Sequence, residues 1–111
     1  MIICVTSKGE GLEARFEEKF GRAPYFVLVD GIDGSVKSVE NPYKDGSGGV
    51  GPRAAQLIKD NRAGVLITGR PGGNAAEALS AAGIEVYGFS GDKSVGELMD
   101  DYRAGKLSRL Q

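Results

Sequence analysis

The stretch that decides the fold is Val65-Leu66-Ile67-Thr68-Gly69-Arg70-Pro71-Gly72-Gly73-Asn74. Its first four residues are apolar or β-branched and are stopped by glycine and proline, which predicts a short buried strand. Asn74, with Glu77 three residues later, predicts an N-cap and capping box for a helix that follows. A buried strand joined to a helix through a glycine-rich turn is the repeating unit of an α/β fold.

Four further strands are predicted on either side of this unit. Short apolar runs place them at residues 2–6, 25–30, 35–40 and 84–87. The connection Gly31-Ile32-Asp33-Gly34 carries an Asp-Gly turn signal, so residues 25–30 and 35–40 are expected to form an antiparallel hairpin.

Helices are predicted between the later strands. Pro52 suits the first position of one helix, and Ser94 with Glu97 forms a second capping-box pattern. Gly64, Gly83 and Gly105 are expected to end the three helices.

Residues 13–20 are ambiguous, because Leu12, Phe16 and Phe20 recur at every fourth position and favour one or two helical turns. Residues 6–20 and 45–51 are expected to be the most mobile segments, because they contain glycines and have few apolar side chains to anchor them.

These elements predict one domain over residues 1–111 with an α/β fold. The sheet is expected to be mixed, with about five strands and with helices packed on it. Only Tyr25–Asp30 is expected to run against its neighbours, because helices between the later strands force parallel crossovers.

Composition limits the partners. The chain has 14 basic and 15 acidic residues and a net charge of −1, so no general nucleic-acid footprint is expected. No transmembrane span or signal peptide is expected, and a single cysteine allows no internal disulfide, so the cytoplasm is the predicted compartment.

Three glycine-rich breaks carry the functional signal. They are Gly46-Ser47-Gly48-Gly49-Val50-Gly51-Pro52-Arg53, the turn at 69–74, and, more weakly, Thr6-Ser7-Lys8-Gly9-Glu10-Gly11. Glycines let backbone N–H groups approach a ligand, and a helix N-terminus favours negative charge. With Arg22, Arg53 and Arg70 beside such turns, the sequence predicts an anion site, although solvated arginines and purely structural glycines remain alternatives.

Other chemistries fit less well. Gly49 to Ala54 matches G-x-G-x-x-A, but the strand that follows ends without the acidic residue of a dinucleotide site, so neither nicotinamide nor flavin is expected. The chain has no histidine, which excludes Ser-His and Cys-His catalysis. Cys4 is interpreted as a small core residue or, alternatively, as a soft ligand for iron, copper or molybdenum.

Several blocks, in order, resemble the dinitrogenase iron–molybdenum cofactor biosynthesis family, which includes carriers of the NifX and NafY type, the C-terminal domain of NifB and the orange protein of sulfate reducers. The blocks are Phe20-Gly21-Arg22-Ala23-Pro24-Tyr25-Phe26, Glu40-Asn41-Pro42, Gly48-Gly49-Val50-Gly51-Pro52-Arg53-Ala54-Ala55, Ala81-Ala82-Gly83-Ile84-Glu85-Val86-Tyr87 and Tyr102-Arg103-Ala104-Gly105-Lys106-Leu107. The resemblance covers essentially the whole chain.

The resemblance implies a ribonuclease H-like three-layer fold and a non-enzymatic carrier or scaffold that holds a molybdenum- or iron–sulfur cluster, or its precursor, non-covalently. Cofactor-assembly proteins are implied as partners, and a homodimer is left open. The expected cluster-binding residues are Thr6, Ser7, Arg22, Gly48, Gly49, Gly51, Arg53, Gly69, Arg70, Gly72 and Gly73, with Cys4 as a candidate metal ligand.

One departure from the family pattern shapes this expectation. Many members carry a histidine before the Phe-Gly-Arg block and another before the Gly-Gly-x-Gly turn, where this chain has Lys19 and Ser47 or Gly48. The cluster is therefore expected to bind through backbone amides, arginines and Cys4. A small-anion or nucleotide sensor and an interaction module without a cluster remain the alternatives.

Overall fold

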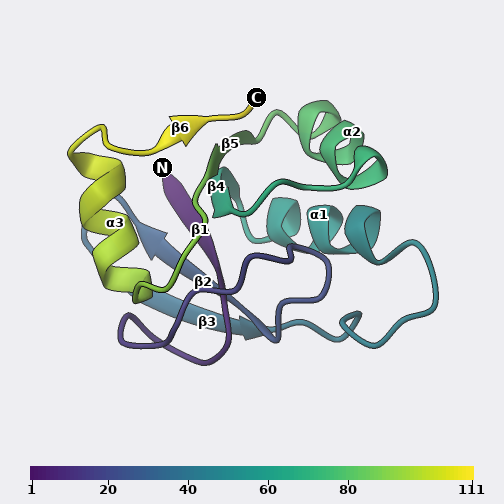
Figure 1. The fold of residues 1–111 in the computed structure, drawn as a ribbon, viewed down its shortest axis with the longest axis horizontal. Coiled ribbons are helices and arrows are strands. Elements are labelled where there is room, and N and C mark those ends of the chain that lie inside the picture. Colours follow the sequence, from purple (N-terminus) through teal and green to yellow (C-terminus); the bar gives the residue numbers. More distant parts are fainter.

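The computed structural model describes all residues from Met1 to Gln111. The chain alternates between strands and helices after an initial run of three strands (Figure 1). In chain order the elements are β1 (Ile2–Ser7), β2 (Tyr25–Asp30), β3 (Val36–Glu40), α1 (Val50–Asp60), β4 (Ala63–Thr68), α2 (Gly73–Ala81), β5 (Glu85–Gly88), α3 (Val95–Arg103) and β6 (Ser108–Arg109).

The strands form one mixed sheet in the order β3-β2-β1-β4-β5-β6. The predicted hairpin is confirmed, because β2 pairs antiparallel with both β1 and β3, and β4 pairs parallel with β1 and β5. The expectation of about five strands was one too few. β6 adds a sixth strand antiparallel to β5, so β2 is not alone in running against its neighbours. The ribonuclease H-like assignment stays a prediction.

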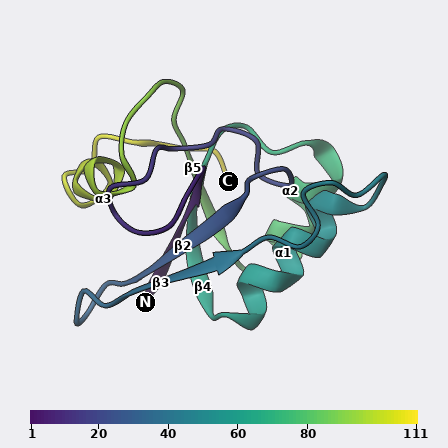
Figure 2. The same cartoon turned by 90° about the horizontal axis from the view of Figure 1, so that it is seen from below.

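Helices cover both faces of the sheet (Figures 1 and 2). On one face, α1 and α2 pack over a cluster that includes Phe26, Ile58 and Leu79. On the other face, α3 packs over a second cluster that includes Phe16, Val27 and Leu98. Alternate residues of the central strands supply the two clusters, as the period of two in a strand requires. The structure is therefore α/β with three layers.

The ends of the helices partly follow the predicted signals. Gly83 and Gly105 follow α2 and α3 with φ of 74° and 71°, as expected for glycines after a helix. The prediction for Gly64 was wrong, because α1 ends at Asp60 and Arg62 takes the left-handed conformation with φ 67°. Pro52 is the third residue of α1, where a missing N–H is still harmless, rather than the first.

Residues 13–20 do not form the helical turns that the apolar spacing favoured. The segment instead lies between β1 and the N-terminus of α3, where Phe16 forms an isolated β-bridge with Ser7 and Arg15 forms one with Ser94. Phe16 donates its N–H to the Lys93 carbonyl and Glu17 donates to the Thr6 carbonyl. Phe16 and Phe20 are buried, each on a different face of the sheet. Tertiary contacts with both faces thus override the local helical spacing.

These contacts also revise the expectation that residues 6–20 are mobile. Only Tyr43 and Gly46 among residues 42–49 donate a backbone N–H to another protein group, whereas residues 8–17 bond to β1 and to the turn before α3. We expect the amides of residues 44–49 to exchange fastest, those of residues 8–17 more slowly, and those of β4 slowest. Hydrogen exchange followed by mass spectrometry measures this order, and equal protection of residues 44–49 and β4 would contradict it.

None of the three helices has the length and apolar character needed to cross a membrane.

Candidate anion-binding site

A pocket of about 430 Å³ lies where the N-termini of α1 and α2 meet the turn that precedes β2. Its volume is in the range of small-molecule sites in proteins. Three short segments build it, and its lining residues are Lys19, Phe20, Gly21, Arg22, Gly49, Val50, Gly51, Pro52, Arg70, Pro71, Gly72, Gly73, Asn74 and Ala75. The glycine-rich turns at 46–53 and 69–74 therefore converge, as the sequence predicted, whereas the weaker one at 6–11 stays outside.

Two glycines explain why the helices begin so close together. Gly49 takes the left-handed conformation (φ 67°) that turns the chain into α1. A Cβ atom on Gly51 would lie 2.7 Å from Cβ of Ala75, so any larger residue would force α1 and α2 apart. Gly72 and Gly73 differ, because a Cβ atom there would meet nothing within 4 Å. Their missing side chains leave open space at the pocket.

Neither helix N-terminus at the pocket is capped by a side chain, and neither helix has an acidic residue in its first turn. The predicted capping box of Asn74 and Glu77 was wrong, because α2 begins two residues earlier than that pattern predicts, with Gly72 at the N-cap. The N–H groups of Gly73, Asn74 and Ala75 consequently have no acceptor in the protein. Such groups, with the helix dipole behind them, attract an anion.

The N-terminus of α3 shows the contrast. Its predicted capping box is confirmed, because Ser94 accepts a hydrogen bond from the Glu97 N–H and donates its own N–H to the Glu97 carboxylate. The Ser94 N–H and hydroxyl hold the pKa of Glu97 below its ordinary value. This helix satisfies its own N-terminus, whereas α1 and α2 leave theirs to the pocket.

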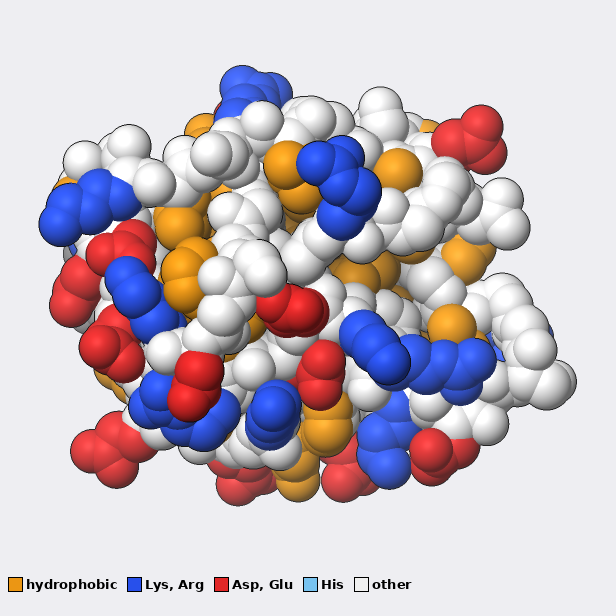
Figure 3. All heavy atoms as spheres, in the orientation of Figure 1, with side chains coloured by type: hydrophobic (Ala, Val, Ile, Leu, Met, Phe, Trp, Pro, Cys, Tyr) orange, Lys and Arg blue, Asp and Glu red, His pale blue; other side chains and the backbone are white.

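The charged side chains at the pocket are all basic. Lys19, Arg22 and Arg70 line it, and no aspartate or glutamate does. Lys19 and Arg70 form no ion pair within the protein. Figure 3 shows Lys and Arg side chains on both sides of the hollow beside the N-termini of α1 and α2. The site therefore combines three cations with two positive helix ends.

Three of the predicted site residues have structural roles instead. The Thr6 hydroxyl lies 3.0 Å from the Thr68 hydroxyl, and the Ser7 hydroxyl donates to the Gly9 carbonyl at 2.7 Å. A Cβ atom on Gly69 would lie 2.5 Å from the Glu18 carbonyl oxygen, so glycine there lets residues 16–19 cross the end of β4. None of the three lines the pocket.

Gly48 and Arg53 also lie outside the lining. The Arg53 guanidinium instead stacks over the Tyr43 ring, with its carbon 5.9 Å from the ring centroid. This cation–π contact holds the loop that leads into α1 rather than a ligand. Of the three predicted arginines, Arg22 and Arg70 line the same pocket and Arg53 does not.

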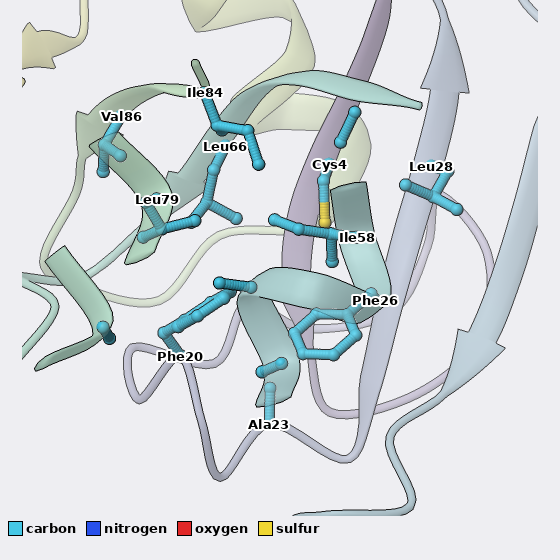
Figure 4. Packing of buried hydrophobic residues seen from close by; sticks show 14 residues of the cluster. Cys4, Phe20, Ala23, Phe26, Leu28, Ile58, Leu66, Leu79, Ile84 and Val86 are labelled. Carbon is cyan, nitrogen blue, oxygen red and sulfur yellow. The ribbon is translucent and has the colours of Figure 1, made fainter. Parts of the chain in front are cut away.

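Cys4 is fully buried among the apolar residues under α1, and its sulfur lies beside Ile58 (Figure 4). Burial raises the pKa of its thiol far above the ordinary value, so the thiolate form that binds metals is disfavoured. The structure does not bring Cys4 to the pocket, and no group of three or more His, Cys, Asp or Glu side chains is placed so that it could hold a metal ion.

Lys19 lines the pocket but is not among the site residues predicted from the sequence. Its position did indicate a role, because many proteins of the family that the sequence resembles carry a histidine there. Phe20, Gly21, Val50, Pro52, Pro71, Asn74 and Ala75 also line the pocket without having been singled out. Most of them contribute backbone or apolar surface, for which a sequence carries no distinct signal.

The pocket supplies N–H donors and positive charge but no protein ligand suited to bond a metal directly. It thus fits an anion that accepts hydrogen bonds at its surface. Residues 1–105 match the family model described as dinitrogenase iron-molybdenum cofactor. The chain belongs to this family. The resemblance drawn from the sequence blocks is thereby confirmed.

Solved structures and a curated relative support the assignment. The apo form of the orange protein from Desulfovibrio gigas is 35% identical, with a TM-score of 0.94 over 98% of this chain and 92% of that chain. A NifB-like protein from Thermotoga is 35% identical, with a TM-score of 0.87 over the same shares. An uncharacterised protein of Methanocaldococcus jannaschii is 29% identical over 87% of this chain and 84% of its own length.

Proposed function

We propose that this protein carries an anionic metal–sulfur cluster, or a precursor of one, in the pocket between α1 and α2. The cargo class is a molybdenum- or iron–sulfur cluster used in cofactor assembly for nitrogen fixation or a related pathway. The protein acts as a cytoplasmic carrier or scaffold and not as an enzyme. It exchanges the cargo with cofactor-assembly proteins.

The observation that carries the proposal is the convergence of two uncapped helix N-termini and three cations on one pocket without a carboxylate. A multiply charged thiometallate presents sulfur atoms that accept hydrogen bonds over its whole surface. Backbone N–H groups of α2, with Lys19, Arg22 and Arg70, hold such an ion from several sides. Family membership favours a metal–sulfur cargo over other anions.

A carrier role also agrees with the side chains available. The chain has no histidine, its one cysteine is buried, and the pocket contains no carboxylate that would act as a general base. Lysine, arginine and backbone N–H groups keep their charge or donor character at neutral pH. They bind and release an anion without transferring a proton.

Titration with tetrathiomolybdate, with and without copper, tests the proposal by visible absorption. We expect saturable binding to the wild type and a loss of about ten- to a hundredfold in affinity for Arg70→Ala, since one charge-assisted hydrogen bond contributes about 1.5–3 kcal/mol. Binding should also weaken as salt is added, because the pocket is open to solvent.

Arg103→Ala is the matched control, because Arg103 is an exposed arginine at the end of α3 on the opposite face of the sheet. It should bind as the wild type does. Absence of saturable binding, or equal losses in both variants, would contradict the proposal. A parallel titration with inorganic phosphate and ATP separates a metal–sulfur carrier from a phosphate or nucleotide sensor, which would prefer those ligands.

A further inference from the structure

The Arg22 side chain forms hydrogen bonds to a loop and also lines the pocket. Its Nη1 donates to the carbonyl oxygens of Lys44 and Gly46, at 2.8 Å and 2.7 Å. Both carbonyls belong to the loop of residues 41–49, which connects β3 to α1 (Figure 2) and whose last residue, Gly49, lines the pocket. Arg22 is also one of the residues that line the pocket.

The guanidinium has donors left for a ligand. An arginine side chain carries five N–H groups, and the two on Nη1 are occupied by the loop. Nε and Nη2 donate to no protein group, which leaves three N–H groups in a fixed planar fork. A single guanidinium can therefore bridge the loop carbonyls and an anion.

The loop depends on this bridge because it makes few bonds of its own. At its two ends the loop is held by backbone bonds, from the Asn41 N–H to the Pro24 carbonyl and from the Arg53 N–H to the Gly49 carbonyl. Its other tethers are the Arg53–Tyr43 stack and the Asn41 side chain, which donates to the Gly21 and Ala23 carbonyls and accepts from the Tyr43 N–H. Beyond Tyr43, only the Gly46 N–H is bonded, to the Tyr43 carbonyl. The order of residues 44–49 thus rests largely on where the Arg22 guanidinium is held.

We infer that Arg22 couples an anion bound in the pocket to the order of the 41–49 loop. The inference rests on the proposed anion binding and adds a consequence to it. An anion that accepts hydrogen bonds from Nε and Nη2 fixes the guanidinium, and Nη1 then fixes the Lys44 and Gly46 carbonyls. The loaded carrier presents an ordered loop with Tyr43 and Arg53 on its surface, and the empty carrier presents a mobile one.

Coupling of this kind is reciprocal, so an anion that favours the ordered loop by a given factor binds the protein with an ordered loop more tightly, by that same factor, than the protein with a mobile loop. Couplings between two sites in one protein usually correspond to about 5–150-fold. The order of the loop therefore depends on whether the pocket is occupied. A receiving protein that contacts the loop can distinguish a loaded carrier from an empty one.

Hydrogen exchange with and without saturating tetrathiomolybdate tests the inference. We expect the amides of residues 44–49 to exchange at least about fivefold more slowly in the loaded wild type. Arg22→Lys should lose this protection even at saturation, because an ammonium group on a flexible stem does not bridge two loop carbonyls and a ligand in one plane. Urea unfolding checks that Arg22→Lys remains folded.

Tyr43→Ala provides a second arm outside the pocket. It removes the ring under Arg53 and loosens the loop, and we expect its affinity for tetrathiomolybdate to fall, by at most the factor by which the anion favours the ordered loop. Tyr43→Phe keeps the ring and should behave as the wild type. Saturable binding with no change in loop exchange, or with Tyr43→Ala at full affinity, overturns the coupling alone. Absence of saturable binding overturns both the coupling and the proposed function.

Discussion

Gly72→Asp is expected to weaken cargo binding at least about a hundredfold while making the protein more stable. Gly72 is the N-cap of α2, its φ of −67° and ψ of 166° suit an aspartate, and a Cβ atom there meets nothing within 4 Å. The new carboxylate would accept the N–H groups of the first turn of α2. Together with the helix dipole and the lower entropy of the unfolded chain, this should raise the free energy of unfolding by about 1 kcal/mol.

The same carboxylate removes the donors on which the cargo depends and adds negative charge to the pocket. Loss of two charge-assisted hydrogen bonds at about 1.5–3 kcal/mol each predicts an affinity at least about a hundredfold lower. Tetrathiomolybdate titration and urea unfolding measure the two effects in one protein. Opposite signs for stability and binding would show that the N-terminus of α2 is kept uncapped for the ligand.

Gly72→Asn is the matched control, since it offers the same cap without the charge. We expect Gly72→Asn to bind more weakly than the wild type but more tightly than Gly72→Asp. If Gly72→Asp bound tetrathiomolybdate as tightly as the wild type does, the cargo would not contact this helix end.

Asn41→Ala is expected to destabilise the protein by about 3 kcal/mol. The Asn41 side chain is almost fully buried (1% exposed) and makes three hydrogen bonds of 2.9–3.0 Å, to Gly21, Ala23 and Tyr43. Each such bond contributes about 0.5–1.5 kcal/mol, and the buried Ala23 carbonyl would be left without a partner. This is a large share of the 5–15 kcal/mol that stabilises a typical domain. Urea denaturation measures the loss.

Asn61→Ala is the comparison of the same chemical change at a less critical place. Asn61 is half-buried at the C-terminus of α1, donates one bond to the Leu57 carbonyl at 2.9 Å and accepts an exposed one from the Lys37 ammonium group at 3.2 Å. We expect a loss of about 1 kcal/mol or less there. Equal effects at the two asparagines would mean that Asn41 does not fix the turn at 21–23 against the loop that follows β3.

Asn41 also shows how much of the structure could be predicted from the sequence. The hairpin of β2 and β3, the central strands, the capping box of α3 and the glycines after α2 and α3 all followed from local patterns. These patterns need only neighbouring residues to act. Asn41 carried no such signal, because its partners lie 18 and 20 residues away in the chain.

The errors have the same cause. The apolar residues of 13–20 have the spacing of a helix. Phe16 and Phe20 nevertheless pack on opposite faces of the sheet, so the segment forms no helical turns. Asn74 does not cap α2, because the helix already begins at Gly73. The short β6 forms by pairing with the edge of β5. In each case a contact distant in sequence outweighed a local preference.

The sequence by itself determined the α/β class, the convergence of two glycine-rich turns and the family, because hydrophobic periodicity, turn residues and motif order are local properties. Only the tertiary structure decided which arginines share a pocket. Arg22 and Arg70 lie 48 positions apart in the chain, yet both line the pocket together with Lys19. Arg53 instead stacks on Tyr43, and Cys4 is buried under α1. The direction of a side chain depends on the elements packed around it, and the packing exists only once the chain has folded.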